Sequence, residues 1–328
     1  MRKPLLQVNN LHVSFSLPKK HLHAVRGASF ILNEGEILGI VGESGCGKST
    51  MAKALVKLLP SSCTISGEII YENSNLVDLS EKEMQKIRGK HIASIFQDPM
   101  TSLNPTTKIG MQIVEGYLQH FRNSSFKEAK EYALDLLELV GIPQATLRFN
   151  EYPHTLSGGM RQRVMIALAL ASKPKLLIAD EPTTALDVTI QAQILDLMMR
   201  IKEKTQTSIL LITHDLSVVA GYCDRVIVMY AGKIIESASV EQLFEYPDHP
   251  YTQRLLRSIP RLDMPKNIPL LPIEGSPPDL TTELRGCAFC TRCNQAMNIC
   301  LLEDPPLKEV HPGHKIACWQ HKIHETSI

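Results

Sequence analysis

Apolar and polar positions follow different periods in different parts of this chain. They alternate over residues 11–15, which predicts a strand with one buried face, and a second apolar stretch covers residues 30–32. Residues 37–41 are all apolar or glycine, as expected for a parallel strand that is buried on both faces. A glycine-rich loop follows, and residues 48–59 then predict a helix, which a proline and two serines end.

Helical and strand patterns alternate through most of the remaining chain. Residues 100–170 are largely helical in pattern, and the segment 128–140 is the clearest amphipathic helix among them. Beyond it, the pattern predicts strands at 176–179, 208–213 and 225–230, a helix at 188–204, and a further strand from residue 234. This order predicts an α/β fold with a parallel sheet that helices cover on both faces, preceded by an antiparallel β subdomain.

Length, composition and charge restrict the class of protein. The chain has 328 residues, of which 44% are apolar and 21% charged, so it can bury a core without disulfides. Its net charge of +1 lacks the basic surplus typical of nucleic-acid-binding domains. No segment reaches the roughly 18 apolar residues of a membrane helix, and the N-terminus is too polar for a signal peptide. We therefore expect a cytoplasmic protein with no nucleic-acid partner, which acts on any membrane process through other subunits.

The composition changes after residue 258. Six prolines fall between residues 260 and 278, which predicts an extended connector. Five of the eight cysteines then lie between Cys287 and Cys318. We expect a main domain over residues 1–258 with a helical subdomain at about 98–170, a proline-rich connector over 259–285, and a cysteine-rich tail over 286–328.

One segment carries a complete phosphate-binding motif. Residues 42–49 fit G-x-x-x-x-G-K-[ST], between a predicted strand and a predicted helix. Glycines let the backbone N–H groups turn toward phosphate oxygens, and the helix start adds the positive end of its dipole. Lys48 is suited to reach the β- and γ-phosphates of a nucleotide, and Ser49 to ligate Mg²⁺. The residues expected to bind the nucleotide here are Gly42, Glu43, Ser44, Gly45, Cys46, Gly47, Lys48, Ser49 and Thr50.

Two carboxylates follow the strand predicted at 176–179. Asp180 and Glu181 stand at its C-terminal edge, where open α/β sheets bind their ligands. Asp180 is suited to hold the Mg²⁺ shell, and Glu181 to orient and polarise the attacking water. The two motifs together predict an enzyme that hydrolyses ATP with Mg²⁺.

Four further segments decide which kind of ATPase this is. Leu156-Ser157-Gly158-Gly159-Met160 is similar to the LSGGQ signature of ATP-binding-cassette proteins, with Met160 where glutamine is commoner. Gln97 resembles that family's glutamine loop, the segment 184–187 its D-loop, and His214 its switch histidine. Phe15 lies where the family places an aromatic ring against adenine. The resemblance covers about residues 5–260, and it implies an ATP hydrolase coupled to transmembrane transport.

The resemblance also implies a head-to-tail pair of cassettes. Ser157, Gly158 and Gly159 of one cassette would close on the nucleotide of the other, and they precede a helical run whose N–H groups make a second anion site. Glu181 is then implied as the general base, and His214 as a contact of the γ-phosphate. Gln97 is implied to sense Mg²⁺ and the γ-phosphate and to signal to the membrane subunits. Asp187, in the D-loop, completes the implied nucleotide-site residues.

Segments outside the cassette resemble one subfamily. Residues 248–256 and 275–280 resemble elements of oligopeptide and dipeptide permease ATPases, and the segment 159–163 is closer to their D-type subunit than to the F-type. The implied machine imports di- or oligopeptides, with two transmembrane permease subunits, a second, unlike ATPase subunit and an extracytoplasmic peptide-binding protein. This chain would be peripheral, at the cytoplasmic face of the inner or plasma membrane. Related members import nickel, glutathione or opines, which remain alternatives.

The crowded cysteines predict a metal or iron–sulfur site, because thiolates are soft ligands. Cys287, Cys290 and Cys293 have the C-x2-C-x2-C spacing that begins a ferredoxin run, but Cys300 departs from that run. The subfamily pattern instead implies a [4Fe–4S] cluster with Cys290 as a further candidate ligand. The four implied ligands are Cys287, Cys293, Cys300 and Cys318.

Two alternatives to the cluster stay open. Zn²⁺ could be held by four of these cysteines, or by three of them with His311 or His314. The thiols could also be free. For a bound metal, the expected role is a structural clip that holds the tail.

Two other classes of protein share parts of the pattern. A soluble cassette protein acting on DNA would need a long heptad insertion, and one acting on ribosomes would carry a second cassette. Neither feature is present in the sequence. A small-molecule kinase would leave the signature segment, His214 and the cysteine tail unexplained. The sequence therefore favours the transporter ATPase.

Overall fold

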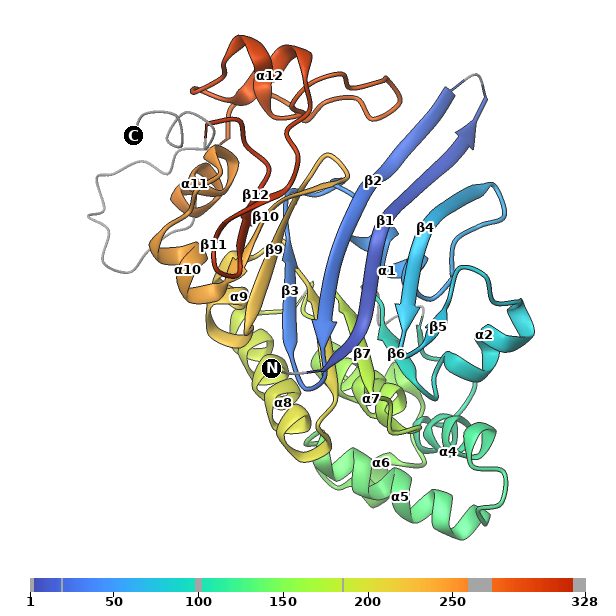
Figure 1. The fold of residues 1–328 in the computed structure, drawn as a ribbon. Coiled ribbons are helices and arrows are strands. Elements are labelled where there is room, and N and C mark those ends of the chain that lie inside the picture. The colour runs from blue at the N-terminus through green and yellow to red at the C-terminus, as the bar shows by residue number, and fades with distance from the viewer. Residues whose placement is uncertain (1–2, 19, 98–101, 185, 259–272, 321–328) are drawn as a thin grey trace. The chain divides into compact units, whose positions relative to one another are not determined.

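The computed structural model describes the chain in five stretches, which divide into two compact units. One unit consists mainly of residues 79–212, and the other of residues 4–32, 37–78 and 213 onward. Residues 98–101 and most of the expected connector, 259–272, lie outside the described stretches. These stretches are residues 3–18, 20–97, 102–184, 186–258 and 273–320 (Figure 1).

The first unit is built on three parallel strands. β7 (Leu176–Asp180) pairs in parallel with β6 (Ile92–Ile95) on one side and with β8 (Ser208–Ile212) on the other. Every residue of β7 and β8 is buried. The apolar runs at 176–179 and 208–213 therefore mark strands inside a sheet, as predicted.

Helices make up the rest of the first unit. α4 (Ile109–His120) and α5 (Phe126–Leu139) pack against each other and against α7 (Gly158–Leu170) (Figure 1). A capping box between Ser125 and Glu128 begins α5, which confirms the amphipathic helix predicted at 128–140. The other helices described in this unit are α2 (Glu81–Ile87), α6 (Ala145–Arg148), the 3-10 helix η1 (Pro153–Thr155) and α8 (Val188–Thr205).

The second unit contains a four-stranded sheet from the N-terminal part of the chain. Its strand order is β2 (Lys20–Asn33), β1 (Pro4–Leu17), β4 (Cys63–Tyr71) and β5 (Ser74–Asn75). β1 pairs antiparallel with β4, with an irregularity between Asn9 and His12. Alternate residues of β1, such as Leu11 and Val13, are buried, as the alternating pattern predicted.

The same unit contains a second row of strands, which the C-terminal tail extends. β3 (Ile37–Val41) pairs in parallel with β9 (Arg225–Tyr230), and β10 (Lys233–Ser239) pairs antiparallel with β9. β12 (His314–Ile316) then adds to β10, and β11 (Lys308–His311) adds to β12. The tail therefore continues the sheet. The helices described in this unit are α1 (Lys48–Leu55), α9 (Leu216–Tyr222), α10 (Val240–Glu245), α11 (Pro250–Arg257), η2 (Cys290–Arg292, a 3-10 helix) and α12 (Asn298–Leu302).

The helix predicted at 48–59 is shorter than expected. α1 ends at Leu55, because Lys57 adopts a left-handed φ of +50° and the Leu58 N–H bonds back to the Lys53 carbonyl. Such a left-handed residue terminates many helices. The apolar residues after it continue the sequence pattern but not the helix.

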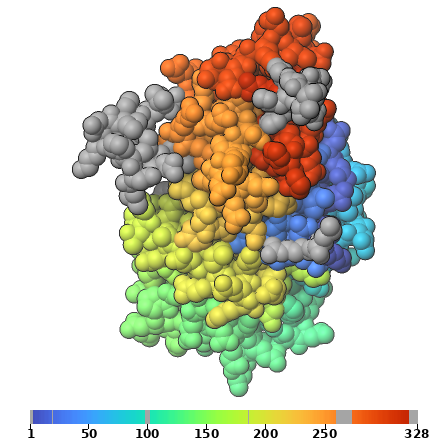
Figure 2. All heavy atoms as spheres, turned by 60° about the vertical axis from the view of Figure 1, so that its left-hand side comes forward, coloured from blue at the N-terminus to red at the C-terminus, as the bar shows by residue number. Residues whose placement is uncertain are grey.

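An aromatic cluster joins the tail to the rest of the second unit. Tyr230 of β9, Tyr251 of α11 and Phe289 of the tail are each at most 1% exposed, with ring centroids 4.8 to 5.4 Å apart. Figure 2 shows the tail packed beside the segment that contains α10 and α11. Burial of three aromatic side chains makes this junction part of the hydrophobic core.

Candidate functional site

The phosphate loop connects β3 to α1 in the second unit. Gly47 has a φ of +102°, and a Cβ there would lie 2.2 Å from the Ala24 carbonyl oxygen. A Cβ at Gly42 would lie 2.2 Å from the Met229 carbonyl oxygen. Ser44 and Gly45 are exposed at the tip, and Ser49 and Thr50 begin α1. The backbone therefore curls as the motif predicted, and only glycine fits at two of its positions.

Lys48 is folded back onto the start of this loop. Its side-chain nitrogen donates to the carbonyl oxygens of Gly42 and Glu43, at 2.7 and 3.0 Å, and the residue is 4% exposed. Cys46, which lies between Glu43 and Lys48 in the sequence, is 5% exposed, and burial raises the pKa of its thiol. The loop therefore presents backbone rather than a reactive thiolate at Cys46.

Two residues far along the chain hold Glu43 of the loop. The hydroxyl of Tyr251 accepts a hydrogen bond from the Glu43 N–H at 2.9 Å, and the guanidinium of Arg292 pairs with the Glu43 carboxylate. Neither partner was predicted from the sequence. Tyr251 lies within a segment that the family resemblance singled out, and Arg292 stands between two candidate cysteine ligands. Neither pattern indicated a contact with the phosphate loop.

Two other predicted nucleotide residues lie in the second unit. Phe15 is half-buried near the end of β1, where it pairs with Cys63 of β4. His214 is exposed and precedes α9, and the N–H of the adjoining Thr213 donates to the carbonyl of Ile40 in β3 at 3.1 Å. The contact of Phe15 with adenine and the contact of His214 with the γ-phosphate remain predictions.

The first unit brings Gln97 and Glu181 together. Glu181 follows β7, and its carboxylate accepts hydrogen bonds from the Gln97 amide at 3.0 Å and from the Thr184 hydroxyl at 2.8 Å. The Glu181 N–H donates to Ile212 at the end of β8. Asp180, the last residue of β7, is 2% exposed. The two predicted carboxylates thus stand at the carboxyl ends of parallel strands, as expected for a ligand site.

The signature segment opens a helix in this unit. Ser157 is the N-cap of α7, and its hydroxyl accepts a hydrogen bond from the Met160 N–H at 3.4 Å. Ser157 and Gly158 are exposed, and Gly159 is half-buried. Asp187, likewise exposed, caps α8 by accepting from the Ile190 N–H at 3.0 Å. Both helix starts therefore present N–H groups and dipole ends to an incoming anion or a second protein.

The tail cysteines lie within electrostatic range of one another but not in a tight group. Burial raises the pKa of Cys287 to about 12, and Cys300 adds to that shift. Burial and then other interactions, including that with Cys300, also raise the pKa values of Cys290, Cys293 and Cys318. Among the described residues, no three of the sulfurs lie within 4.8 Å of one another. Burial therefore favours the thiol over the thiolate form at Cys287, Cys290, Cys293 and Cys318.

A different group in the second unit has closely spaced polar atoms. His314 of β12 bonds to Glu236 of β10 at 2.8 Å and lies 3.8 Å from Asp248, and His314 and Glu236 are at most 1% exposed. The hydrogen bond with Glu236 raises the pKa of His314. This buried pair holds the tail hairpin on β10. Because His314 is engaged there, the structure does not bring it to the cysteines, and His311 pairs with it in the turn.

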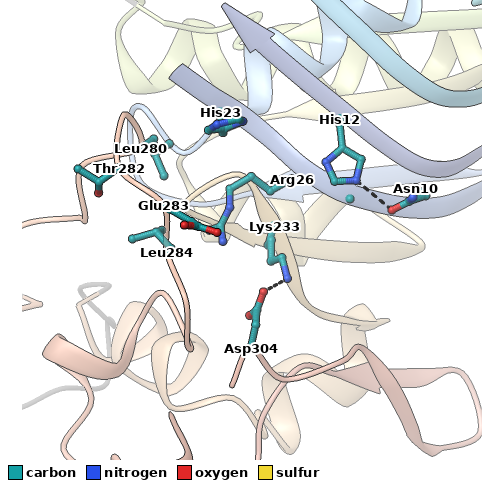
Figure 3. Close-up of a pocket in the computed structure, with 11 residues that line it drawn as sticks. Asn10, His12, His23, Arg26, Lys233, Leu280, Thr282, Glu283, Leu284 and Asp304 are labelled. Carbon is teal, nitrogen blue, oxygen red and sulfur yellow. Dashed lines mark hydrogen bonds and ion pairs between the residues drawn. The ribbon is translucent and has the colours of Figure 1, made fainter. Parts of the chain in front are cut away.

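A cavity of about 600 Å³ also lies in the second unit, between β1, β2 and the C-terminal segment (Figure 3). Its lining carries both signs of charge: Arg26 and Lys233 face Glu283 and Asp304, and Lys233 forms an ion pair with Asp304. Burial, with Lys233, lowers the pKa of His12 in its wall. None of the residues predicted to bind the nucleotide or a metal lines it.

Among the described residues, no helix combines the length and the apolar character needed to cross a bilayer.

Comparisons with known proteins give one consistent result. Residues 25–184 match the family model described as ABC transporter, and residues 235–300 match that of the oligopeptide/dipeptide transporter C-terminal region. The chain is 53% identical to the oligopeptide transport ATP-binding protein OppD of Bacillus subtilis, over 96% of this chain and 88% of that protein. It is 51% identical to the dipeptide transport ATP-binding protein DppD of the same organism, over 96% and 94%.

A similar result comes from a Gram-negative relative and from solved structures. The chain is 49% identical to OppD of Escherichia coli, over 96% of this chain and 93% of that protein. A dimeric post-hydrolysis state of the ATP-binding cassette MJ0796, bound to ADP and Pi, superposes with a TM-score of 0.65 at 28% identity. The superposition covers 72% of this chain and 98% of that one. The predicted cassette core, with parallel and antiparallel strands and helices, is thus confirmed.

Proposed function

The chain belongs to the ATP-binding proteins of ABC transporters, and from this premise we propose that it is the ATP-hydrolysing subunit of an importer for di- or oligopeptides. Its relatives are named for oligopeptide or dipeptide transport, and about half of the residues are identical to theirs. One observation carries the proposal: a complete phosphate loop and the peptide-transporter C-terminal region occur in the same chain. ATP hydrolysis supplies the energy, and other subunits form the path for the cargo.

In the second unit, the phosphate loop binds the triphosphate. The N–H groups of residues 44–50, in the loop and the first turn of α1, point to the phosphate oxygens. Lys48 exchanges its contacts with Gly42 and Glu43 for the β- and γ-phosphates. Phe15 stacks on adenine, and His214 contacts the γ-phosphate. These assignments follow from the positions of the motifs that the chain shares with ABC transporter ATP-binding proteins.

In the first unit, Glu181 is the general base for the attacking water. The hydrogen bonds from Gln97 and Thr184 orient its carboxylate, so that it accepts the water proton without first reorganising. Gln97, which is proposed to sense the γ-phosphate, keeps this bond to Glu181. It thereby links the catalytic carboxylate to the segment that contacts the membrane subunits.

A Mg²⁺ ion, when bound with the nucleotide, would neutralise charge on the β- and γ-phosphates. The hydroxyl of Ser49, the amide of Gln97 and the buried carboxylate of Asp180 offer the hard oxygen donors that Mg²⁺ prefers. Ser49 belongs to the second unit and Gln97 and Asp180 to the first, and the family motifs imply all three as its ligands.

The exposed signature residues support a pair of cassettes. Ser157, Gly158 and Asp187 stand at exposed helix starts of the first unit, so a second cassette can reach them. MJ0796, which resembles this chain, is dimeric with ADP and Pi. We assign the second cassette to an unlike ATPase subunit, joined by two transmembrane permease subunits and an extracytoplasmic peptide-binding protein. This chain then lies at the cytoplasmic face of the membrane.

We assign the cysteine tail to a [4Fe–4S] cluster, as the subfamily pattern implies, with zinc as the alternative. Cys300 acts electrostatically on the four other thiols, so all five surround one region of the tail. Cys287, Cys293, Cys300 and Cys318 would hold the cluster, with Cys290 as the alternative to one of them, and its role would be to fasten the tail.

The decisive experiment identifies the partners of the intact protein. The tagged chain is purified from gently solubilised native membranes, and the proteins that accompany it are identified by mass spectrometry. Two polytopic subunits, a second cassette and a peptide-binding protein would support the proposal. Ribosomal or DNA-repair proteins without membrane subunits would overturn the transport role and leave only the ATPase.

A further inference from the structure

The C-terminal tail reaches the phosphate loop through one side chain. Arg292 lies in the short helix η2, and its side chain is only 3% exposed. Its guanidinium donates to both carboxylate oxygens of Glu43, at 2.7 and 2.9 Å. Glu43 is the second residue of the loop that the proposed function assigns to ATP. Two segments 249 residues apart in the sequence are therefore joined by a partly buried, bidentate ion pair.

Three further hydrogen bonds fix the orientation of Arg292. Its Nε donates to the Glu274 carbonyl at 2.9 Å, Nη2 also donates to the Ile273 carbonyl at 3.0 Å, and Nη1 also donates to the Tyr230 hydroxyl at 3.2 Å. All three nitrogens are thus engaged. A planar guanidinium held in this way offers its carboxylate partner one position, which a lysine could not define.

The peptide groups of Glu43 are held as well. The Glu43 N–H donates to the hydroxyl of Tyr251, which is fully buried in the aromatic cluster. The Glu43 carbonyl accepts the hydrogen bond from Lys48. Glu43 is therefore fixed at its side chain, its N–H and its C=O, and the last of these contacts is with the lysine assigned to the phosphates.

We propose that Arg292 is a positioning residue of the nucleotide site: it holds Glu43, and through Glu43 the peptide on which Lys48 rests, in the conformation that receives ATP. The inference rests on the proposed function of the phosphate loop and adds the tail to that site. When the bridge is absent, the loop must be ordered as ATP binds, so affinity falls while the reacting groups are unchanged. A bridge that only fastened the tail would change stability and leave nucleotide affinity unaltered.

The test compares three variants of the full chain. Arg292→Gln removes the ion pair, and Arg292→Lys keeps the charge with one bond in place of two. The control Arg285→Gln makes the same change as Arg292→Gln at an exposed arginine just before the tail. ATP·Mg²⁺ affinity is measured by calorimetry, and hydrolysis at saturating ATP in the assembled transporter. Fluorescence of Trp319, the single tryptophan, reports whether the tail is folded.

We expect Arg292→Gln to weaken ATP binding about tenfold, with the saturated hydrolysis rate within about twofold of the unaltered chain. Arg292→Lys should recover part of the affinity, and Arg285→Gln should match the unaltered chain. ATP affinity within twofold in Arg292→Gln, with the Trp319 signal intact, would overturn the inference. A chain that never binds ATP would instead overturn the proposed function.

A second pair of variants decides the question if Arg292→Gln does not fold. Glu43→Gln removes the same ion pair from the loop side, and it should weaken ATP binding by a similar factor. In combination with Arg292→Gln the loss should not increase, because both changes remove one interaction. An unchanged affinity in Glu43→Gln, or losses that multiply in the double variant, would show that Arg292 does not act through Glu43.

Discussion

Gln97 donates a hydrogen bond of 3.0 Å to the carboxylate of Glu181, 84 residues further along the chain. The Thr184 hydroxyl donates to the same oxygen at 2.8 Å. Glu181 also has a φ of +48°, which is unfavourable for a residue with a side chain. Such strain is kept where the surrounding contacts over-determine the conformation. The carboxylate proposed as general base is therefore held in one orientation by the residue proposed as the sensor.

Replacing this carboxylate should separate binding from hydrolysis. Glu181→Gln keeps the size of the side chain and an oxygen that can accept from Thr184, but it cannot take a proton from water. We expect ATP hydrolysis to fall by a factor of about 10² to 10⁴, the range of general-base catalysis. ATP should remain bound, and the paired cassettes should stay closed. Single-turnover release of phosphate measures the first effect, and retention of labelled ATP on the protein measures the second.

The control for this variant is Glu203→Gln, at an exposed position of α8. It makes the same chemical change away from the site and should hydrolyse ATP at the unaltered rate. Robust turnover in Glu181→Gln would remove Glu181 from the role of general base.

The phosphate loop offers a second prediction, based on the space around its glycines. In Gly47→Ala the new Cβ would lie 2.2 Å from the Ala24 carbonyl oxygen, and φ is +102°. The clash with the backbone and the unfavourable φ therefore both destabilise the variant. In Gly45→Ala φ is also positive, at +80°, but no atom lies within 4 Å of the Cβ. We expect Gly47→Ala to lose at least about 2 kcal/mol of stability and most ATP affinity, and Gly45→Ala to lose about 1 kcal/mol.

Thermal unfolding of the nucleotide-free chain, followed by ATP titration, measures both effects. Gly221→Ala serves as the control, because Gly221 lies in α9 with open space around its Cβ and no positive φ. Equal effects of the changes at Gly45 and Gly47 would show that the Ala24 carbonyl does not restrict the loop.

The sequence predicted the parts of this molecule that depend on local pattern. Apolar runs marked β3, β7, β8 and β9, and the phosphate motif placed its loop between a strand and a helix, as the structure has it. The hydrogen bond between Gln97 and Glu181 could be anticipated only from the family resemblance. It requires the ends of two strands to meet, and spacing along the chain does not show that.

Other features had no local signal. β12 has three residues, of which Lys315 is exposed, so it is too short to show a strand period. The end of α1 depends on the left-handed Lys57, while the leucines after it continue the apolar pattern. The partnership of Arg292 with Glu43 spans 249 residues, and it exists only because the tail packs on Tyr230 and Tyr251. Long-range pairs of this kind follow from tertiary packing.

The cysteine tail leads to a prediction about bound metal. The chain purified without oxygen should contain about four irons and an equal amount of acid-labile sulfide, as a [4Fe–4S] cluster requires. Cys300→Ala should remove the iron, because Cys300 is one of the four proposed ligands. Cys290→Ala tests the further candidate ligand: retained iron would support the four-cysteine set without Cys290, and lost iron would show that Cys290 is a ligand.

Cys63→Ala, on β4 outside the tail, is the matched control and should keep its iron. Bound zinc without acid-labile sulfide would show that the tail holds zinc and not a [4Fe–4S] cluster. A tail that holds neither metal, in protein kept free of oxygen throughout, would leave the five thiols free and refute the proposed cluster.

The tail should also detach in acid, because of a buried histidine. His249 is 2% exposed; its Nδ1 accepts from the Tyr251 N–H at 3.0 Å, and burial lowers its pKa from 6.5 to about 4. The folded state therefore favours the neutral ring. Its contribution to stability is complete above pH 6.5 and is lost as the pH falls toward 4, which amounts to roughly 3 kcal/mol at 1.36 kcal/mol per pKa unit.

Urea unfolding followed by Trp319 fluorescence, between pH 7.5 and 4.5, measures this loss at the tail itself. In His249→Gln the acid-side decrease should shrink by most of that amount, since glutamine does not titrate there and its side-chain oxygen can still accept from Tyr251. His21→Gln, at an exposed position of β2, should keep the full decrease. His314 acts in the opposite direction: its pKa is raised by Glu236, so its contribution is present below pH 6.5 and is lost as the pH rises through the higher folded value. An acid-side decrease as steep in His249→Gln as in the unaltered chain would assign the effect to other groups, and the neutral, buried His249 would not be what fastens the tail.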